Sequence, residues 1–325
     1  MTTPINTTYR RKTNVKQTSQ TGKSKAAPVQ RDLYREVTDK IIGLLEKGVV
    51  PWKKPWKTLL TGEGDVPRNY VSKKAYRGMN LWLLIGNEYE RPYYMTFNQA
   101  LKLGGNVKKG AKGHWVVFWK MMEGKNEKEE MKTVPLLRYD VVFNIADIEG
   151  IPFDFPPIRT NEQKRNGSGV IPECEAVING FKRGPTVIFN NPEEACYYPA
   201  LDTVNMPTIE AFKTPEQYYK VFFHEFAHST GHYTRLNRDL TGIKFGERYN
   251  KEELIAEMTG ALLCGAAGLN MNEDSSLTAS SAGYLAMYIN LLRDDKRMIF
   301  TASTQAQKAA NLILGIQETE PEIME

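Results

Sequence analysis

The alternation of hydrophobic and polar residues predicts a mixed α/β pattern that begins after the first thirty residues. Apolar residues recur at helical spacing over 31–47, which predicts an amphipathic helix. Two short helices are expected next, at 76–85 and 96–103. Runs rich in β-branched and aromatic residues then predict strands at 114–120 and 139–145. The first half of the chain is therefore expected to combine helices and strands in one domain.

The second half begins after a stretch, 153–170, whose Pro, Asn, Gly and Arg residues predict a linker. Strands are expected at 185–190 and 196–204, and helical patterns follow them. These four helices are expected at 215–231, 251–266, 279–292 and 302–314. The predicted fold class is α+β. The predicted domains are a tail at 1–30, an N-terminal domain at 31–152, the linker at 153–170 and a C-terminal domain at 171–325.

Composition is ordinary for a water-soluble protein, with 41% hydrophobic and 25% charged residues. No apolar run reaches the ~18 residues that a membrane span needs, so no membrane partner is expected. The three cysteines (Cys174, Cys196 and Cys264) are odd in number and have no CxxC spacing, which favours a reducing, cytoplasmic compartment. The polar N-terminus lacks the apolar segment of a secretory signal.

Charge separates the two halves. Residues 1–150 carry a balance of +12 and residues 151–325 one of −7, within a net charge of +5. Opposite signs suggest two tasks, with the basic half facing a polyanion. The tail 1–30 holds six basic and no acidic residues, which predicts disorder. It can serve as a solubilising leader or as a basic arm near nucleic acid.

Metal chemistry is indicated by the H-E-x-x-H sequence at His224, Glu225 and His228. Because the two histidines are one helical turn apart, both imidazoles leave one face and can bind the same ion. Glu225 can then act as general base toward a metal-bound water. Thr214 and Pro215 are typical of a helix start. Two surface histidines are the alternative, but three of the four histidines fall within nine residues here.

A catalytic zinc site needs a third protein ligand. A metzincin would place a histidine at position 234, which is Thr234, so that class is excluded. The helix that contains Glu253 and Glu257 resembles the second zinc helix of thermolysin-like gluzincins. That resemblance implies Glu253 as the third ligand and Glu257 as the carboxylate that orients an imidazole, with exchanged roles also open. His232 is expected beside the metal ligands or beside the substrate rather than on the metal.

Basic and aromatic residues are interleaved in the N-terminal half, and all five tryptophans lie between 52 and 119. Single-stranded nucleic acid is held in this way, because cations follow the phosphates while bases stack on rings. Core packing is the alternative for several of these rings. The candidate nucleic-acid-binding residues are Trp52, Lys53, Lys54, Trp56, Arg68, Asn69, Tyr70, Lys74, Arg77, Asn80, Lys108, Lys109, Lys112 and Trp115.

Long motifs in both halves resemble ArdC-type antirestriction proteins. In the N-terminal half these are GVVPWKKPW, PRNYVSKKAYRGMN, MTFNQALKLGGNVKKGAKG and VVFNIADIEGIP. In the C-terminal half they are HEFAHSTGHYTRLNRDL, FGERYNKEELIAEMTGALLC and TASTQAQKAANLIL. The resemblance covers nearly all of residues 31–316. It implies an N-terminal domain that binds single-stranded DNA, a zincin-like metallopeptidase domain, and a role in protecting mobile-element DNA from restriction.

Two functions are consistent with these observations. In the first, the basic domain binds single-stranded DNA while a Zn²⁺ enzyme, active or latent, cleaves an unidentified protein substrate nearby. In the second, DNA coating alone blocks restriction and zinc only stabilises the fold. An intact Glu225 favours the first function, since a structural zinc site needs no general base.

Overall fold

We describe the fold from a computed structural model of the chain. The described residues are 32–53, 66–85, 87, 89–125, 131–155, 169–241, 246–269 and 278–317. Residues Leu33–Glu325 group into one compact unit. The expected basic tail at 1–30 lies outside the described residues, as does most of the expected linker. The domain limits at 152 and 171 therefore stay a prediction.

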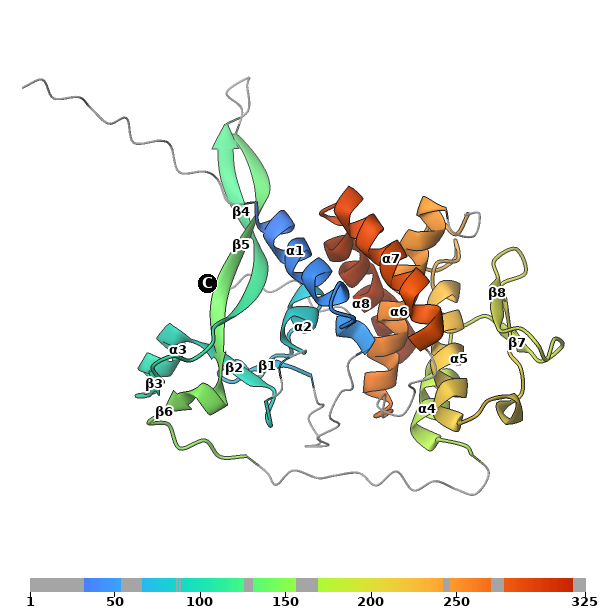
Figure 1. The fold of residues 1–325 in the computed structure, drawn as a ribbon, viewed down its shortest axis with the longest axis horizontal. Helices are drawn as coiled ribbons and strands as arrows, with labels where there is room; N and C mark the ends of the chain where they lie inside the picture. Colours follow the sequence, from blue (N-terminus) through green and yellow to red (C-terminus); the bar gives the residue numbers. More distant parts are fainter. Residues whose placement is uncertain are drawn as a thin grey trace, which may run out of the picture. The chain divides into compact units, whose positions relative to one another are not determined.

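A four-stranded sheet with the order β1-β2-β5-β4 forms the centre of the N-terminal half (Figure 1). β4 (His114–Lys125) and β5 (Met131–Asn144) pair antiparallel as a long ribbon, from His114↔Val142 to Lys125↔Met131. Both strands are longer than predicted, because their pairing continues into the charged stretch between them, as far as Lys125 and Met131. The sheet is completed by β1 (Arg68–Asn69), parallel to β2, and by β2 (Tyr93–Thr96), antiparallel to β5.

Two short helices and a small sheet lie beside these strands. α2 (Met79–Leu84) and α3 (Phe97–Lys102) confirm the helices expected in those regions. β3 (Asn106–Val107) pairs with β6 (Ile148–Glu149), which follows the short helix η2 (Ile145–Asp147). α3, β3 and β6 therefore gather at one end of the large sheet (Figure 1).

The N-terminal helix α1 (Leu33–Leu45) buries Leu33, Val37, Ile41 and Leu45, the apolar stripe that its sequence predicts. It packs against helices of the C-terminal half. The rings of Tyr34 and Phe300 meet edge-on at 4.9 Å between centroids. The short helix η1 (Pro51–Lys53) follows. Apolar side chains of both halves therefore share one hydrophobic cluster.

In the C-terminal half, α4 (Pro172–Gly180), which the sequence analysis did not predict, precedes a sheet of order β7-β9-β8. β7 (Thr186–Ile188) runs parallel to β9 (Thr203–Asn205), and β8 (Cys196–Tyr198) runs antiparallel to it. The single strand predicted at 196–204 is thus wrong. A turn divides it at Pro199, and Asp202 adopts a left-handed conformation with a φ of 49°.

Helices build the rest of this half, after the short helix η3 (Ile209–Ala211). All four predicted helices are present. α6 and α8 begin four residues before the predicted starts, and α7 extends two residues past its predicted end. No helix among the described residues is long and apolar enough to cross a bilayer. The helices are α5 (Pro215–Ser229), α6 (Glu247–Ala266), α7 (Thr278–Asp294) and α8 (Met298–Leu314).

The N-terminal sheet contains a buried histidine, His114, that gives its stability a dependence on pH. The Nε2 atom of His114 lies 3.1 Å from the Tyr89 hydroxyl, which donates to Asp147 at 2.7 Å. Burial and the nearby Lys112 and Lys40 lower the pKa of His114 to about 4. In the unfolded chain this imidazole takes up a proton near pH 6.5, whereas in the folded chain it stays neutral down to about pH 4. The unfolded state therefore binds more protons between these values, and the free energy of unfolding falls as the pH drops from 6.5 toward 4.

We therefore expect acidification from pH 7 to pH 5 to lower the free energy of unfolding by ~2 kcal/mol more in the wild type than in His114→Gln. Urea denaturation at the two pH values measures this difference, and the remaining histidines, common to both proteins, serve as the internal control. Equal losses in both proteins would contradict the assignment.

Candidate metal site

The helix that carries the two motif histidines starts and packs as its sequence predicts. The Thr214 hydroxyl accepts a hydrogen bond from the Gln217 backbone N–H at 3.2 Å, and Pro215 occupies the first turn. The helix ends at Ser229, two residues before Gly231. Its buried face is largely aromatic and fixes the helix in the core. The buried aromatic residues are Tyr218, Tyr219, Phe222, Phe223 and Phe226.

Three potential metal ligands converge between α5 and α6. Ligand atoms of His224, His228 and Glu253 all lie within 4.8 Å of one another. The two Nε2 atoms are 3.1 Å apart. The Glu253 carboxylate oxygens lie 3.3 Å from Nε2 of His228 and 3.6 Å from Nε2 of His224. Two imidazole nitrogens and one carboxylate form a donor set that suits a four-coordinate divalent metal with one open position.

Electrostatics favour a cation at this point. Burial alone would raise the pKa of Glu253, but the hydrogen bond with His228 and the charges of both imidazoles lower it to about 2. Burial likewise opposes charge on His228, yet hydrogen bonds with Glu252 and Glu253 outweigh it and raise the pKa of His228 to about 10. The carboxylates thus stabilise positive charge where the donor atoms converge, as a bound metal requires.

Glu225 lies beside these ligands in a desolvated position. Its side chain is almost entirely buried. Burial raises the pKa of Glu225, while His224 and His228 and a hydrogen bond from the Tyr197 backbone N–H act in the opposite direction. The edge strand β8 is therefore connected directly to the carboxylate that the sequence analysis identified as general base. A carboxylate whose proton affinity is raised by burial is suited to take a proton from a metal-bound water.

Glu252, which was not among the candidates from the sequence, contacts the imidazole of His228 at the ring nitrogen that does not face the other ligands. Nδ1 of His228 lies 3.3 Å from Oε1 of Glu252. Arg238 binds the same carboxylate through two hydrogen bonds, of 2.9 Å and 2.7 Å. Glu252 thus has, toward His228, the orienting role that the resemblance gave to Glu257. The group of three potential ligands among the described residues contains Glu253 and not Glu257. Among the alternatives left open, the structure favours Glu253 as the third ligand.

We expect Glu252→Gln to weaken metal binding by about 10–100-fold, the usual cost of losing an outer-shell partner. The glutamine amide can donate to Nδ1 of His228, which places the imidazole proton on Nε2, where the metal must bind. Competition against a chromophoric chelator measures the affinity. Glu247→Gln is the matched control, since Glu247 is on the same helix and pairs with Lys251 at the surface. Equal affinities in all three proteins would refute the role of Glu252.

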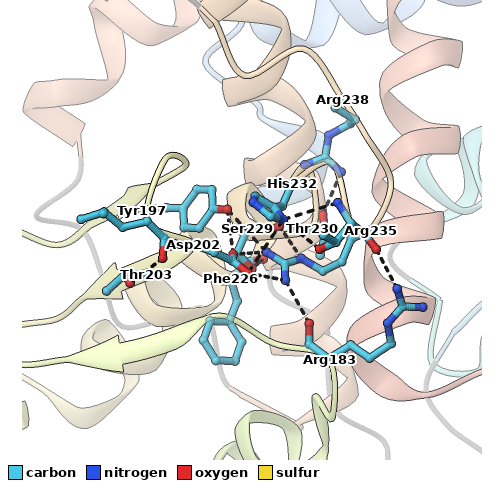
Figure 2. A network of polar contacts seen from close by, with 12 residues as sticks. Arg183, Tyr197, Asp202, Thr203, Phe226, Ser229, Thr230, His232, Arg235 and Arg238 are labelled. Carbon is cyan, nitrogen blue, oxygen red and sulfur yellow. Dashed lines mark hydrogen bonds and ion pairs between the residues drawn. The ribbon is translucent and has the colours of Figure 1, made fainter.

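A second polar network fastens the β8–β9 hairpin to the segment after α5 (Figure 2). Arg235 donates to both carboxylate oxygens of Asp202, and Tyr197 donates to the same carboxylate at 2.9 Å. Arg235 also donates to the backbone oxygen of Ser229, at the end of α5, at 2.7 Å. The hairpin is thereby fixed relative to the helix that carries the two histidines. His232 joins the edge of this network, with Nδ1 3.8 Å from Asp202.

Several candidate nucleic-acid residues have structural roles. Trp52 is completely buried, with its ring edge-on to Tyr288 at 5.7 Å, so the expectation that it stacks on a base is wrong. A large apolar ring gains more from the shared core than from solvent. Asn69 is buried and bonds the backbone N–H groups of Val71 and Ser72. Asn80 bonds the backbone of Val117 in β4.

Other candidates remain accessible. Lys74, Arg77, Lys108, Lys109 and Lys112 are exposed. Lys108 also donates to the Ala146 carbonyl at 2.8 Å.

The other three described candidates are half-buried. They are Arg68, whose guanidinium donates to the Lys73 carbonyl, Tyr70, which packs on Phe153, and Trp115, which packs on Tyr139. Lys54, Trp56 and the side chain of Lys53 lie outside the described residues.

Comparisons with known proteins agree with this division into two parts. Residues 31–143 match the N-terminal domain of anti-restriction factor ArdC. Residues 175–305 match a zincin-like metallopeptidase domain.

Similar proteins include DNA primases that are much longer than this chain and a protein of about its length. A DNA primase TraC of Escherichia coli is 28% identical over 310 residues, which are 90% of this chain but 28% of the primase. The chain therefore spans about a quarter of that relative. The uncharacterized protein y4eC of Sinorhizobium fredii is 33% identical over 300 residues, 86% of this chain and 91% of that protein.

Crystal structures of the antirestriction ArdC protein from plasmid R388 are similar throughout. The metal-free form is 34% identical, covers 87% of this chain and 97% of its own, and superposes with a TM-score of 0.70. The Mn(II)-bound form also has a TM-score of 0.70. With both domains matched in order and a relative aligned over nearly its whole length, this chain belongs to the ArdC family of antirestriction proteins.

Proposed function

We propose that this protein binds single-stranded DNA through its N-terminal half and cleaves a protein near that DNA with its zincin-like half, protecting incoming mobile-element DNA. The observation that carries the enzymatic part is the position of Glu225. It is a buried carboxylate beside a group of two histidines and one glutamate, and a site that only stabilises the fold needs no such base. This favours catalysis over DNA coating alone.

Zinc is the metal we propose. A site of two imidazoles and one carboxylate matches a usual set of protein ligands for catalytic zinc. The ArdC protein of plasmid R388 has been crystallised with Mn(II), so a protein of this family binds a divalent ion. When bound, the metal would polarise the scissile carbonyl and lower the pKa of its water. His224, His228 and Glu253 would hold it, and Glu225 would accept the proton of the water and pass it to the leaving amine.

For the DNA-binding part, the support is the basic N-terminal half and the exposed cations on it. Lys74, Arg77, Lys108, Lys109 and Lys112 are all accessible. Single strands differ from duplexes in presenting unpaired base faces, and the exposed aromatic residues of this half, Phe97 and Trp119, suit them. Similarity to two DNA primases is consistent with a partner that is DNA.

We expect sequence-tolerant binding of single-stranded DNA that weakens steeply with salt. If the protein neutralises about five phosphates, affinity falls roughly a hundredfold between about 50 and 200 mM salt. Fluorescence anisotropy with a labelled oligothymidine, and with a duplex of equal length as control, measures both properties. Binding that ignores salt, or that prefers the duplex, would exclude this part of the proposal.

A further inference from the structure

An exposed patch of apolar and basic residues lies on the N-terminal half, at the end of the sheet where α3 packs. Phe97, Leu101 and Leu103 are 48%, 47% and 46% exposed, and Val71 is 47% exposed. Phe97 and Leu101 are one helical turn apart, so they share one face of α3. We call Phe97, Leu101 and Val71, together with the exposed Lys73, Lys74 and Lys102, the α3 patch. Exposed apolar side chains on one helix face, and on the turn that Asn69 joins to that helix, indicate a site of interaction.

The patch is rigidly built. The Asn69 side chain accepts hydrogen bonds from the backbone of Val71 and Ser72, both at 3.0 Å, and fixes the turn that presents Val71. Its amide nitrogen donates to Gln99 of α3 at 3.0 Å. Gln99 in turn forms a reciprocal capping box with Thr96 at the start of α3. One buried asparagine therefore joins the 70–74 turn to the helix that carries Phe97.

The charges of the patch have one sign. Residues 70–74 and 97–103 contain Lys73, Lys74 and Lys102 and no acidic residue. Lys73 adopts a left-handed conformation with a φ of 60°, which is rare for a residue with a side chain. Its ammonium lies 3.9 Å from the centroid of the Tyr70 ring. Strained backbone that presents a cation is typical of functional sites, and these cations favour a polyanionic occupant.

We propose that the α3 patch is the part of the N-terminal half over which single-stranded DNA passes, with a base stacked on the Phe97 ring. Lys73, Lys74 and Lys102 contact the phosphates on either side, and Val71 and Leu101 cover the edges of the stacked base. A flat aromatic face among cations is the arrangement that holds unpaired bases without reading their sequence. This inference rests on the proposed binding of single-stranded DNA and adds Phe97, Lys73 and Lys102, with Val71 and Leu101, to the candidate Lys74.

Substitutions at Phe97 test the proposal in the full-length protein. The affinity for a labelled oligothymidine is measured by anisotropy at low salt. Phe97→Leu keeps the apolar bulk but removes the ring, and we expect binding to weaken about five- to hundredfold. Phe97→Tyr keeps the ring and should bind within about twofold of wild type, since either ring offers a stacking face. Trp119→Leu is the matched control, because Trp119 is also 48% exposed but lies on β4.

Failure of the patch and failure of DNA binding give different results. If the wild type binds the oligonucleotide and Phe97→Leu binds equally well, the α3 patch is refuted while the proposed function stands. A loss at Trp119→Leu without one at Phe97→Leu refutes it too and moves the DNA path to β4. If the wild type does not bind, both proposals fail. Sedimentation completes the test: a wild-type dimer that Phe97→Leu dissociates would assign the patch to a second copy of this chain.

Discussion

Replacing Glu253 by alanine is expected to abolish tight binding of a divalent metal, whereas replacing Glu257 is not. The Glu253 carboxylate lies 3.3 Å and 3.6 Å from the two Nε2 atoms that face it, and it supplies the negative ligand of the group. Without it only the two imidazoles remain as ligands. We expect the affinity to fall by more than about a hundredfold, beyond the cost of losing an outer-shell partner. Elemental analysis of purified, dialysed protein measures the bound metal.

Glu257→Ala provides the matched control, since it removes the same group one turn further along α6. The wild type and this variant should each retain one equivalent of metal, and circular dichroism should show that all three proteins are folded. Retention of metal by Glu253→Ala together with its loss in Glu257→Ala would assign the third ligand to Glu257 and contradict the described geometry. No metal in the wild type, even after reconstitution, would remove the enzymatic part of the proposed function.

The motif helix was predictable because its information is local. A helix start, an apolar body and two histidines one turn apart fix both the element and the shared face of His224 and His228. The third ligand depended on packing between α5 and α6, which spacing alone does not determine. Resemblance to gluzincins pointed to Glu253, and the structure brings that residue to the histidines.

The acid behind His228 could not be read from the sequence. Glu252 and Glu253 are adjacent on α6. Only the packing of α6 against α5 shows that Glu252 contacts Nδ1 of His228 while Glu253 contacts Nε2. Arg238, ten residues after His228, follows no spacing rule. Its role becomes clear from electrostatics, because a buried carboxylate such as Glu252 requires a cationic partner, and Arg238 is that partner.

Long-range packing also explains the errors in the N-terminal half. Trp52 stands between prolines and lysines, and this local composition is typical of a nucleic-acid loop. Its burial comes from Tyr288, more than two hundred residues away. Phe97 and Leu101 lie in a short helix that the sequence predicts, but their exposure appears only in the structure. The turn at Asp202 was missed because its partner, Arg235, belongs to another element.

Glu225→Gln is expected to keep the metal and lose peptide hydrolysis by about 10²–10⁴-fold, the contribution of a positioned general base. Glutamine preserves the shape of the side chain, so the three metal ligands should remain in place, but an amide cannot accept the proton of the metal-bound water. Since the natural substrate is unidentified, the probe is a mixture of denatured proteins incubated with the metal-loaded enzyme, with new termini counted by mass spectrometry. Glu247→Gln, on the surface of α6, should cleave as the wild type does.

Glu225→Gln and Glu247→Gln also distinguish protein cleavage from DNA coating as the source of protection in cells. If cleavage of a protein near the DNA is what defeats restriction, Glu225→Gln should lose protection while keeping its affinity for single-stranded DNA, because Glu225 lies beside the metal ligands, in the other half of the chain. Full protection by a variant that binds metal but cleaves nothing would instead show that coating the DNA suffices. The metal would then act by joining α5 to α6 through His224, His228 and Glu253, a contribution to folding rather than to catalysis.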